Sequence, residues 1–209
     1  LKGGFYHSGQ VCVSVQRVFV PRAELPDFAA ELAEGAEALT VGDPTKAETQ
    51  CGPLIRPAEV DRVASWVDAA VQGGARLAAG GKRMGSTLYQ PTVLVDPPCD
   101  ADVSRKEVFG PVVCIYGYDD VDAAIGQANA LPYAFQAAVF TDRMSWADYC
   151  VETLAASAVM VNDHTAFRVD WMPFAGRRQS GLGTGGIGYT MVDMSEEKMV
   201  VVNAPSSVR

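Results

Sequence analysis

This sequence has no long apolar run, few histidines and no excess of positive charge. No stretch of about 18 consecutive apolar residues occurs, so nothing in the sequence predicts a membrane span. Only two histidines are present, and the five cysteines include no Cys-x-x-Cys spacing, so we expect no zinc-type metal site. The net charge of −8 argues against nucleic-acid and anionic-membrane partners, which both require basic surfaces.

The remaining composition is that of an ordinary globular chain. Apolar residues make up 48% and charged residues 20% of 209 residues, enough to bury a full core without disulfides. The odd number of cysteines without a disulfide pattern predicts reduced thiols and a cytoplasmic location. Because the first residue is Leu1 rather than Met, we expect the natural N-terminus, and any targeting peptide, to lie upstream.

Helical and strand patterns alternate along the chain. This alternation predicts an α/β fold, a three-layer αβα domain with a mostly parallel twisted sheet. Ligand sites in such sheets lie at the carboxyl ends of the strands. Helical spacing of apolar residues covers 26–39, 57–73, 121–130 and 144–155, and short β-branched runs cover 92–95, 112–118, 137–141 and 157–162.

One thiol has a setting that favours chemistry. The sequence Ser8-Gly9-Gln10-Val11-Cys12 places it behind a Gly-Gln turn and ahead of an apolar run. A thiol exposed on a turn near a helix end can favour the thiolate, which predicts a nucleophile. The alternative is that Cys12 is a small core residue, since cysteine is among the most buried residue types. The other cysteines lack this setting and are interpreted as structural; they are Cys51, Cys99, Cys114 and Cys150.

The segment from Phe5 to Cys12, followed by Gln-Arg-Val-Phe-Val at 16–20, resembles the active-site cysteine region of the NAD(P)-dependent aldehyde dehydrogenases. In that family the region lies well past the middle of the polypeptide. The resemblance therefore implies the C-terminal part of an enzyme. It also implies that the Rossmann domain, the glutamate that activates water and the asparagine of the oxyanion hole lie upstream of Leu1.

A second block reads Glu107-Val108-Phe109-Gly110-Pro111 ahead of a β-branched run. A carboxylate can accept hydrogen bonds from ribose hydroxyls, and an aromatic ring can pack against a flat nicotinamide. Taken alone, the block also fits a surface glutamate and a core phenylalanine. It resembles the Glu-x-Phe-Gly-Pro motif of the family, which implies that Glu107 holds the ribose of NAD or NADP and that Phe109 borders its nicotinamide.

A third block is the polar loop at 161–176, which closes on Trp171-Met172-Pro173-Phe174. Polar loops after buried strands often form the lip of a pocket. In the family the corresponding loop lines the entrance for the aldehyde. Arg168 could attract an anionic substrate, although a solvated loop arginine is the commoner case. The predicted pocket walls are Asn162, His164, Phe167, Arg168, Trp171 and Phe174.

Two glycine patterns need interpretation. The run at 181–186 formally satisfies Gly-x-Gly-x-x-Gly, but it follows no predicted strand, so we reject it as a dinucleotide motif and expect a tight loop near the active site. Conversely, alanine or serine replaces a glycine of the family pattern at four positions. Any of these that needs a positive φ would be strained by about 1 kcal/mol or more. They are Ala134, Ala138, Ser157 and Ala175.

The end of the chain is a short apolar run at 198–203. Such a strand needs a sheet edge, either in its own domain or in another subunit. In the family it pairs with another subunit, which implies a homo-oligomer. We therefore expect a catalytic domain at 1–194 and a C-terminal oligomerisation strand and tail at 195–209.

The sequence thus predicts an oxidoreductase that oxidises a small aldehyde with NAD(P)+, with water or coenzyme A as the acyl acceptor. The block around Phe167 and Phe174 looks nearest to the branch with the lactaldehyde and non-phosphorylating glyceraldehyde-3-phosphate dehydrogenases. Two alternatives stay open. One is a thiol hydrolase in which Cys12 pairs with His7 or His164. The other is a folded, oligomerising domain without activity of its own.

Overall fold

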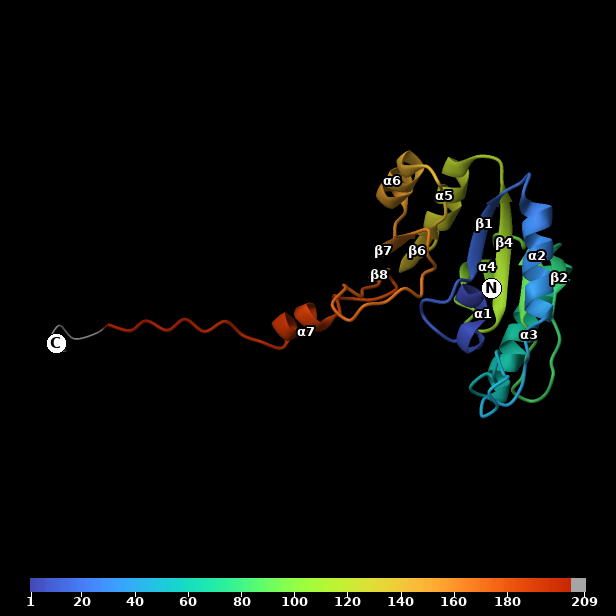
Figure 1. Ribbon diagram of the computed structural model, residues 1–209, viewed down its shortest axis with the longest axis horizontal. Helices are drawn as coiled ribbons and strands as arrows, with labels where there is room; N and C mark the ends of the chain where they lie inside the picture. The colour runs from blue at the N-terminus through green and yellow to red at the C-terminus, as the bar shows by residue number, and fades with distance from the viewer. Residues whose placement is uncertain (204–209) are drawn as a thin grey trace.

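The computed structural model describes residues 1–203, in which helices and strands alternate (Figure 1). Its helices are α1 (Lys2–Phe5), η1 (Tyr6–Gly9, a 3-10 turn), α2 (Leu25–Glu37), α3 (Pro57–Gln72), α4 (Asp102–Arg105), α5 (Val121–Asn129), α6 (Met144–Thr153) and α7 (Ile187–Asp193). Its strands are β1 (Arg17–Pro21), β2 (Arg76–Ala79), β3 (Thr92–Val95), β4 (Val112–Tyr118), β5 (Tyr133–Ala134), β6 (Gln136–Val139), β7 (Ala158–Val161) and β8 (Arg177–Arg178). All four predicted helices and all four predicted strands are confirmed.

The central sheet has four strands in the order β1-β4-β3-β2. Strands β1 and β3 both run parallel to β4, and β2 is antiparallel to β3 at the edge. Outside this sheet, β6 and β7 form a parallel pair and β5 pairs with β8 antiparallel. The sheet is therefore mostly parallel, as predicted, but the strands after β4 form separate pairs instead of joining it.

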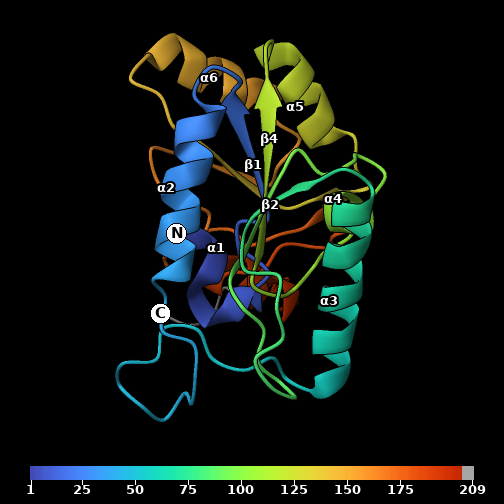
Figure 2. The same ribbon diagram turned by 90° about the vertical axis from the view of Figure 1, so that its right-hand side faces the viewer.

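Helices cover both faces of the central sheet, with α2 on one side of β1 and β4 and α3 on the other (Figure 2). Side chains alternate along β4: Val112 and Cys114 pack with α3, while Val113 and Ile115 pack with α2. Both faces are buried, so the strand is apolar throughout. This arrangement confirms the three-layer α/β class.

Each covering helix has a proline in its first turn and buries a narrow stripe. Proline near the first turn costs no hydrogen bond there, because that N–H has no helical acceptor. In α3 the buried residues include Val60, Val63, Ala64 and Val67, spaced three and four apart, so they form one face. Helix α2 uses alanines on its buried face, which lets it lie close to the sheet.

The predicted C-terminal strand is unpaired in this structure. Residues 198–203 are exposed and pair with no strand in the part of the chain that the structure describes. Helix α7 and the following residues up to 203 extend away from the rest of the molecule (Figure 1). Completion of the domain's own sheet is therefore not what the structure shows, and pairing with another subunit stays a prediction. Residues 204–209 of the predicted tail lie outside the described residues.

The strain expected at the glycine replacements is absent. None of the four replaced positions, 134, 138, 157 and 175, has a positive φ. An alanine or serine is therefore tolerated at each without the left-handed penalty. The run at 181–186 follows the two-residue strand β8, which is antiparallel, so no βαβ unit surrounds it. Positive φ at Gly183 and Gly186 confirms a tight loop there.

Candidate functional site

Cys12 lies on an exposed turn between η1 and β1. Burial raises the pKa of the Tyr6 phenol, and the charge of Cys12 contributes to the rise. Three other cysteines are buried, and burial raises the pKa of each, that of Cys114 to about 12. Cys99 is exposed like Cys12. Exposure therefore separates Cys12 from the buried thiols but not from Cys99.

The residues before Cys12 are fixed by hydrogen bonds to a distant loop. Ser8 is buried, and its hydroxyl donates to the carbonyl of Gly52 at 2.7 Å. The side chain of Gln10 donates to the carbonyl of Pro53 at 3.1 Å and accepts from the N–H of Ile55 at 2.9 Å. These bonds use both ends of the Gln10 amide. The turn that presents the thiol is therefore tied to residues more than 40 positions away.

Gly9 brings the thiol turn against the second sequence block. A Cβ at Gly9 would overlap the carbonyl oxygen of Gly110, and the φ of Gly9 is +69°. Glycine is thus required twice at this position, for a close backbone approach and for a left-handed backbone. The contact between Gly9 and Gly110 places Cys12 beside the block that contains Glu107 and Phe109.

A small surface hollow contains all three residues that the sequence predicts for catalysis and cofactor binding. Cys12, Glu107 and Phe109 line it together with Gln16 and residues of the surrounding turns. Its volume is about 20 Å³, close to the space that one water molecule needs. The Cys12 segment and the Glu107 block therefore meet at this hollow, which in this chain is too small to enclose a substrate.

Two side chains that the sequence did not single out fix the position of this block. Gln16 forms hydrogen bonds with backbone groups on both sides of Glu107, and Arg62 from α3 donates to the carbonyl of Val108 at 2.7 Å. Nothing in the linear sequence joins Gln16 to residues about 90 positions later. Its place four residues after Cys12, within the segment that resembles the family, is the only local signal that could have marked it.

The third sequence block meets the first through Thr165. Its buried hydroxyl donates to the carbonyl of Val13, next to Cys12. His164 lies beside Gly3, at the start of the segment that carries the thiol. The side chain of Asn162 is engaged elsewhere, because its two polar atoms bond the backbone N–H and carbonyl of Thr141. The loop therefore contacts the thiol segment, although the amide of Asn162 does not face it.

Further along this loop, aromatic and cationic side chains form their own cluster. The guanidinium of Arg168 lies 4.7 Å from the centre of the Phe174 ring, which packs edge-on against Phe135. Phe167 and Trp171 are largely exposed, at 48% and 76%. None of the six predicted pocket residues lines the hollow beside Cys12. Their role as walls of a substrate pocket stays a prediction.

The thiol hydrolase alternative needs a histidine hydrogen bonded to the Cys12 sulfur. Among residues 1–203, no hydrogen bond joins that sulfur to His7 or His164. The Nδ1 atom of His164 instead accepts the backbone N–H of Ala166 at 3.1 Å. The described part of the chain also holds no group of three His, Cys, Asp or Glu side chains arranged for a metal ion. Nor does any helix in that part have the length and apolar character to cross a membrane.

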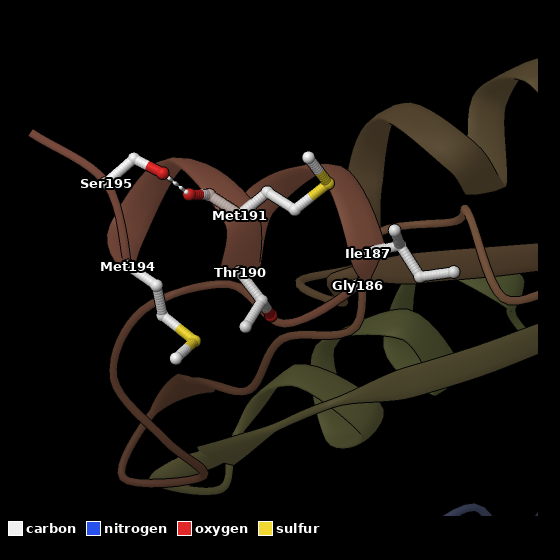
Figure 3. A pocket seen from close by; sticks show the side chains of 6 residues that line it. All are labelled: Gly186, Ile187, Thr190, Met191, Met194 and Ser195. Carbon is white, nitrogen blue, oxygen red and sulfur yellow. Dashed lines mark hydrogen bonds between the residues drawn. The ribbon is translucent and has the colours of Figure 1, made fainter. Parts of the chain in front are cut away.

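An apolar groove lies on α7, away from the thiol. Figure 3 shows the side chains of Ile187, Met191 and Met194 along it, with the Ser195 hydroxyl hydrogen bonded to the carbonyl of Met191. Ile187, Met191 and Met194 are 58%, 65% and 83% exposed. The helix thus leaves an apolar surface uncovered beside the equally exposed segment 198–203.

Comparison with known proteins gives consistent matches over nearly the whole chain. Residues 1–200 match the model of the Aldehyde dehydrogenase family. The chain is 41% identical over 199 residues to the 3-sulfolactaldehyde dehydrogenase of Priestia aryabhattai, covering 95% of this chain and 42% of that protein. It is 36% identical over 203 residues to the lactaldehyde dehydrogenase of Methanococcus aeolicus, covering 97% of this chain and 43% of that protein.

A solved structure agrees with these relatives. The glyceraldehyde-3-phosphate dehydrogenase GapN from Methanocaldococcus jannaschii, complexed with NADP, matches with a TM-score of 0.89 at 35% identity. The match covers 93% of this chain and 42% of that one. The chain therefore spans less than half the length of the relatives that it matches.

Proposed function

Because the chain belongs to the aldehyde dehydrogenase family and resembles its lactaldehyde and GapN members, we propose that it is the nucleophile-bearing part of an NAD(P)-dependent aldehyde dehydrogenase. In this proposal residues 1–194 form the catalytic domain and residues 195–209 the oligomerisation strand and tail. The observation that carries the proposal is the hollow shared by Cys12, Glu107 and Phe109. The predicted nucleophile and the two predicted cofactor contacts line it together, from segments about 95 residues apart.

The residues at the hollow fit one end of a nicotinamide cofactor. Glu107 is exposed, so its carboxylate is free to accept hydrogen bonds from the two hydroxyls of a ribose. The Phe109 ring is 41% exposed and can pack against a flat nicotinamide. When bound, NAD or NADP would supply the acceptor for the hydride. This chain's own residues would hold and orient only that end of the molecule.

Cys12 would carry the covalent chemistry. Its thiolate attacks the aldehyde carbon, forming a C–S bond as the carbonyl π electrons move to oxygen. Among the described residues, the backbone N–H of Cys12 has no hydrogen-bond acceptor, so it is available to stabilise the resulting oxyanion. Loss of hydride from the thiohemiacetal carbon leaves a thioester on the sulfur. Water then displaces the thiolate and releases the carboxylic acid; coenzyme A in place of water would give an acyl-CoA.

The loop at 162–174 is proposed to shape the aldehyde site. Thr165 already anchors this loop to the thiol segment, so small movements there would reach Cys12. The exposed side chains of Phe167, Arg168 and Trp171 are available to a substrate. A panel of lactaldehyde, glyceraldehyde-3-phosphate and betaine aldehyde would separate the substrate classes. Loss of preference for the phosphorylated aldehyde in Arg168→Ala would support an anion-attracting role.

The partners of the chain follow from the same proposal. The aldehyde is a small molecule, the remaining length of the family supplies the cofactor domain, and the apolar end of the chain pairs with another subunit. All five cysteines are free, which fits a reducing, cytoplasmic compartment. We expect neither nucleic acid nor membrane among the partners, because the net charge is −8.

The direct test is aldehyde-dependent formation of NADH or NADPH by the full-length protein that contains this chain. Cys12→Ser should lower kcat by about 10³-fold or more, because the covalent route is lost. Cys99→Ser, which removes the other exposed thiol, should leave kcat unchanged. Equal activity of the Cys12→Ser and unsubstituted proteins would refute the proposed nucleophile.

The 209-residue chain alone is expected to form no NAD(P)H. Two contacts to one end of the cofactor cannot offset the several kcal/mol of lost freedom on binding. Measurable aldehyde oxidation by the chain alone, at stoichiometric protein, would contradict this expectation and show that the site is complete within it.

A further inference from the structure

Gln16 bridges the thiol segment and the cofactor block. Its Nε2 atom donates to the carbonyls of Val103 at 2.9 Å and Lys106 at 2.8 Å. Its Oε1 atom accepts the N–H of Val108 at 2.8 Å. The bonds to Lys106 and Val108 lie directly before and after Glu107. A single side chain therefore fixes the backbone on both sides of the predicted ribose ligand.

The position of Gln16 is itself fixed. Its backbone carbonyl accepts the N–H of Cys114 at 2.8 Å, at the point where β1 joins β4 in the central sheet. Gln16 follows Cys12 by four residues and lines the same hollow. The Gln16 side chain thus connects the start of β1 to the loop that contains Glu107, at the hollow that Cys12 also lines.

The backbone that Gln16 fixes is strained. Phe109 has a φ of +47°, in the left-handed region that a phenylalanine rarely adopts. Such conformations persist when surrounding contacts determine them. Both backbone groups of the preceding residue, Val108, are occupied: the N–H by Gln16 and the carbonyl by Arg62. The Gln16 bond is therefore one of the contacts that hold the backbone ahead of Phe109 in this conformation.

We propose that Gln16 is a positioning residue that holds Glu107 and Phe109 against Cys12. The inference rests on the proposed function, because it assigns Gln16 a role through the predicted cofactor contacts. Gln16 touches neither the aldehyde nor the cofactor in this proposal. It acts through the backbone of residues 103–108, and its loss separates the nucleophile from the two residues that orient the cofactor.

The test uses the chain itself with Cys99→Ser, so that a trifluoroacetonyl tag from bromotrifluoroacetone reports on Cys12. The ¹⁹F resonance of the tag senses the ring current of Phe109, and Phe109→Leu defines the shift that the ring causes. Gln16→Met keeps the length of the side chain and removes its three side-chain hydrogen bonds. It should move the resonance to the Phe109→Leu position and speed amide exchange of Val108 about tenfold or more, since net hydrogen bonds are lost.

Gln72→Met is the matched control, because Gln72 is exposed at the end of α3 and makes no side-chain hydrogen bond in the described chain. It should change neither the tag resonance nor the amide exchange of Val108.

If Gln16→Met does not fold, Gln16→Glu replaces it. The carboxylate still accepts from the N–H of Val108 but cannot donate to the carbonyls of Val103 and Lys106. That variant should give an intermediate resonance and intermediate exchange of Val108.

The outcomes separate the inference from the proposed function. The positioning role alone would be overturned by the following result. Phe109→Leu shifts the tag resonance, but neither Gln16→Met nor Gln16→Glu changes the resonance or the amide exchange of Val108. A resonance that ignores Phe109→Leu would remove the geometry on which both depend. Failure of Cys12 to react with the tag would contradict the proposed nucleophile, while Val108 exchange would still test Gln16.

Discussion

At the scale of single residues, the backbone before Cys12 is unusual. His7, Ser8 and Gly9 all have positive φ, at 49°, 57° and 69°. Two consecutive non-glycine residues in this region are unfavourable, and the bond from Ser8 to Gly52 offsets part of that cost. The turn therefore exposes the Cys12 thiol and buries the Ser8 hydroxyl.

Gly9→Ala tests the close approach to Gly110. The substitution should lower the free energy of unfolding by about 2 to 4 kcal/mol, because the left-handed backbone and the backbone overlap both oppose a methyl group. Gly126→Ala is the matched control, since Gly126 lies inside α5 with open space around it. That change should stabilise the chain by about 0.5–1 kcal/mol. If Gly9→Ala and Gly126→Ala unfold at the same urea concentration, the close approach of Gly9 to Gly110 does not require glycine.

The cysteines predict a second residue-scale result. Iodoacetamide at neutral pH should modify Cys12 first, because alkylation follows access and thiolate fraction. Cys99 is exposed and should follow. The three buried thiols, whose pKa values are raised by burial, should react only on unfolding. Peptide mapping in which Cys51 or Cys150 is labelled before Cys12 would count against Cys12 as the nucleophile.

At the scale of elements, α3 covers the sheet and also contacts the loop around Val108 through Arg62. Its Arg62 reaches the carbonyl of Val108, lies over the ring of Trp66 and pairs with Glu59 one turn earlier at 2.8 Å. Glu59 also pairs with Arg56 ahead of the helix at 2.8 Å. The first turns of α3 therefore connect its own N-terminus to the loop that contains Glu107 and Phe109, the predicted cofactor contacts.

The charge of Glu59 gives α3 a pH dependence. Hydrogen bonds from Arg62 and Arg56 lower the pKa of Glu59 in the folded chain. Its contribution to stability is thus complete above the pKa of an unfolded glutamate, about 4.3, and is lost as the pH falls through the lowered value. Glu59→Gln should flatten the loss of stability below about pH 4.3 in urea titrations, whereas Glu48→Gln, in an exposed loop, should not. Parallel curves for all three proteins would disprove this role of Glu59.

At the scale of the whole molecule, the chain has a well-packed body and an uncovered end. Two apolar clusters fill the two faces of the central sheet. The groove on α7 and the segment 198–203 expose methionine and valine side chains instead. An apolar strand with open hydrogen-bonding groups is a template for another chain.

The exposed apolar segment 198–203 should cause the chain to self-associate. The chain is expected to sediment as a dimer or larger species at micromolar concentration, and deletion of all residues after Glu197 should shift it toward monomer. Deletion of only residues 204–209, which keeps the apolar segment, is the control and should leave the association intact. A full chain that is already monomeric at high micromolar concentration would show that the exposed segment has no partner in a second copy.

The sequence alone determined most of the elements and the family that the chain resembles. Runs at 92–95 and 112–118 were predicted with their observed bounds, because β-branched residues in a fully buried strand leave an unmistakable local pattern. Strand β2 was missed, since it is an edge strand with exposed Arg76 and Leu77 and carries no such pattern. Local motifs also predicted roles for Cys12 and Glu107, and those roles stay predictions.

Tertiary structure alone decided how those motifs meet. The overlap distance between Gly9 and Gly110, the bonds of Gln16 and the anchoring of Thr165 join segments that are about 90 to 150 residues apart. Hydrogen bonds and close packing at such separations depend on the order of strands in the sheet, which periodicity does not encode. For the same reason the sequence could not show that the Asn162 side chain bonds the backbone of Thr141, and the pocket predicted at 162–174 stays a prediction.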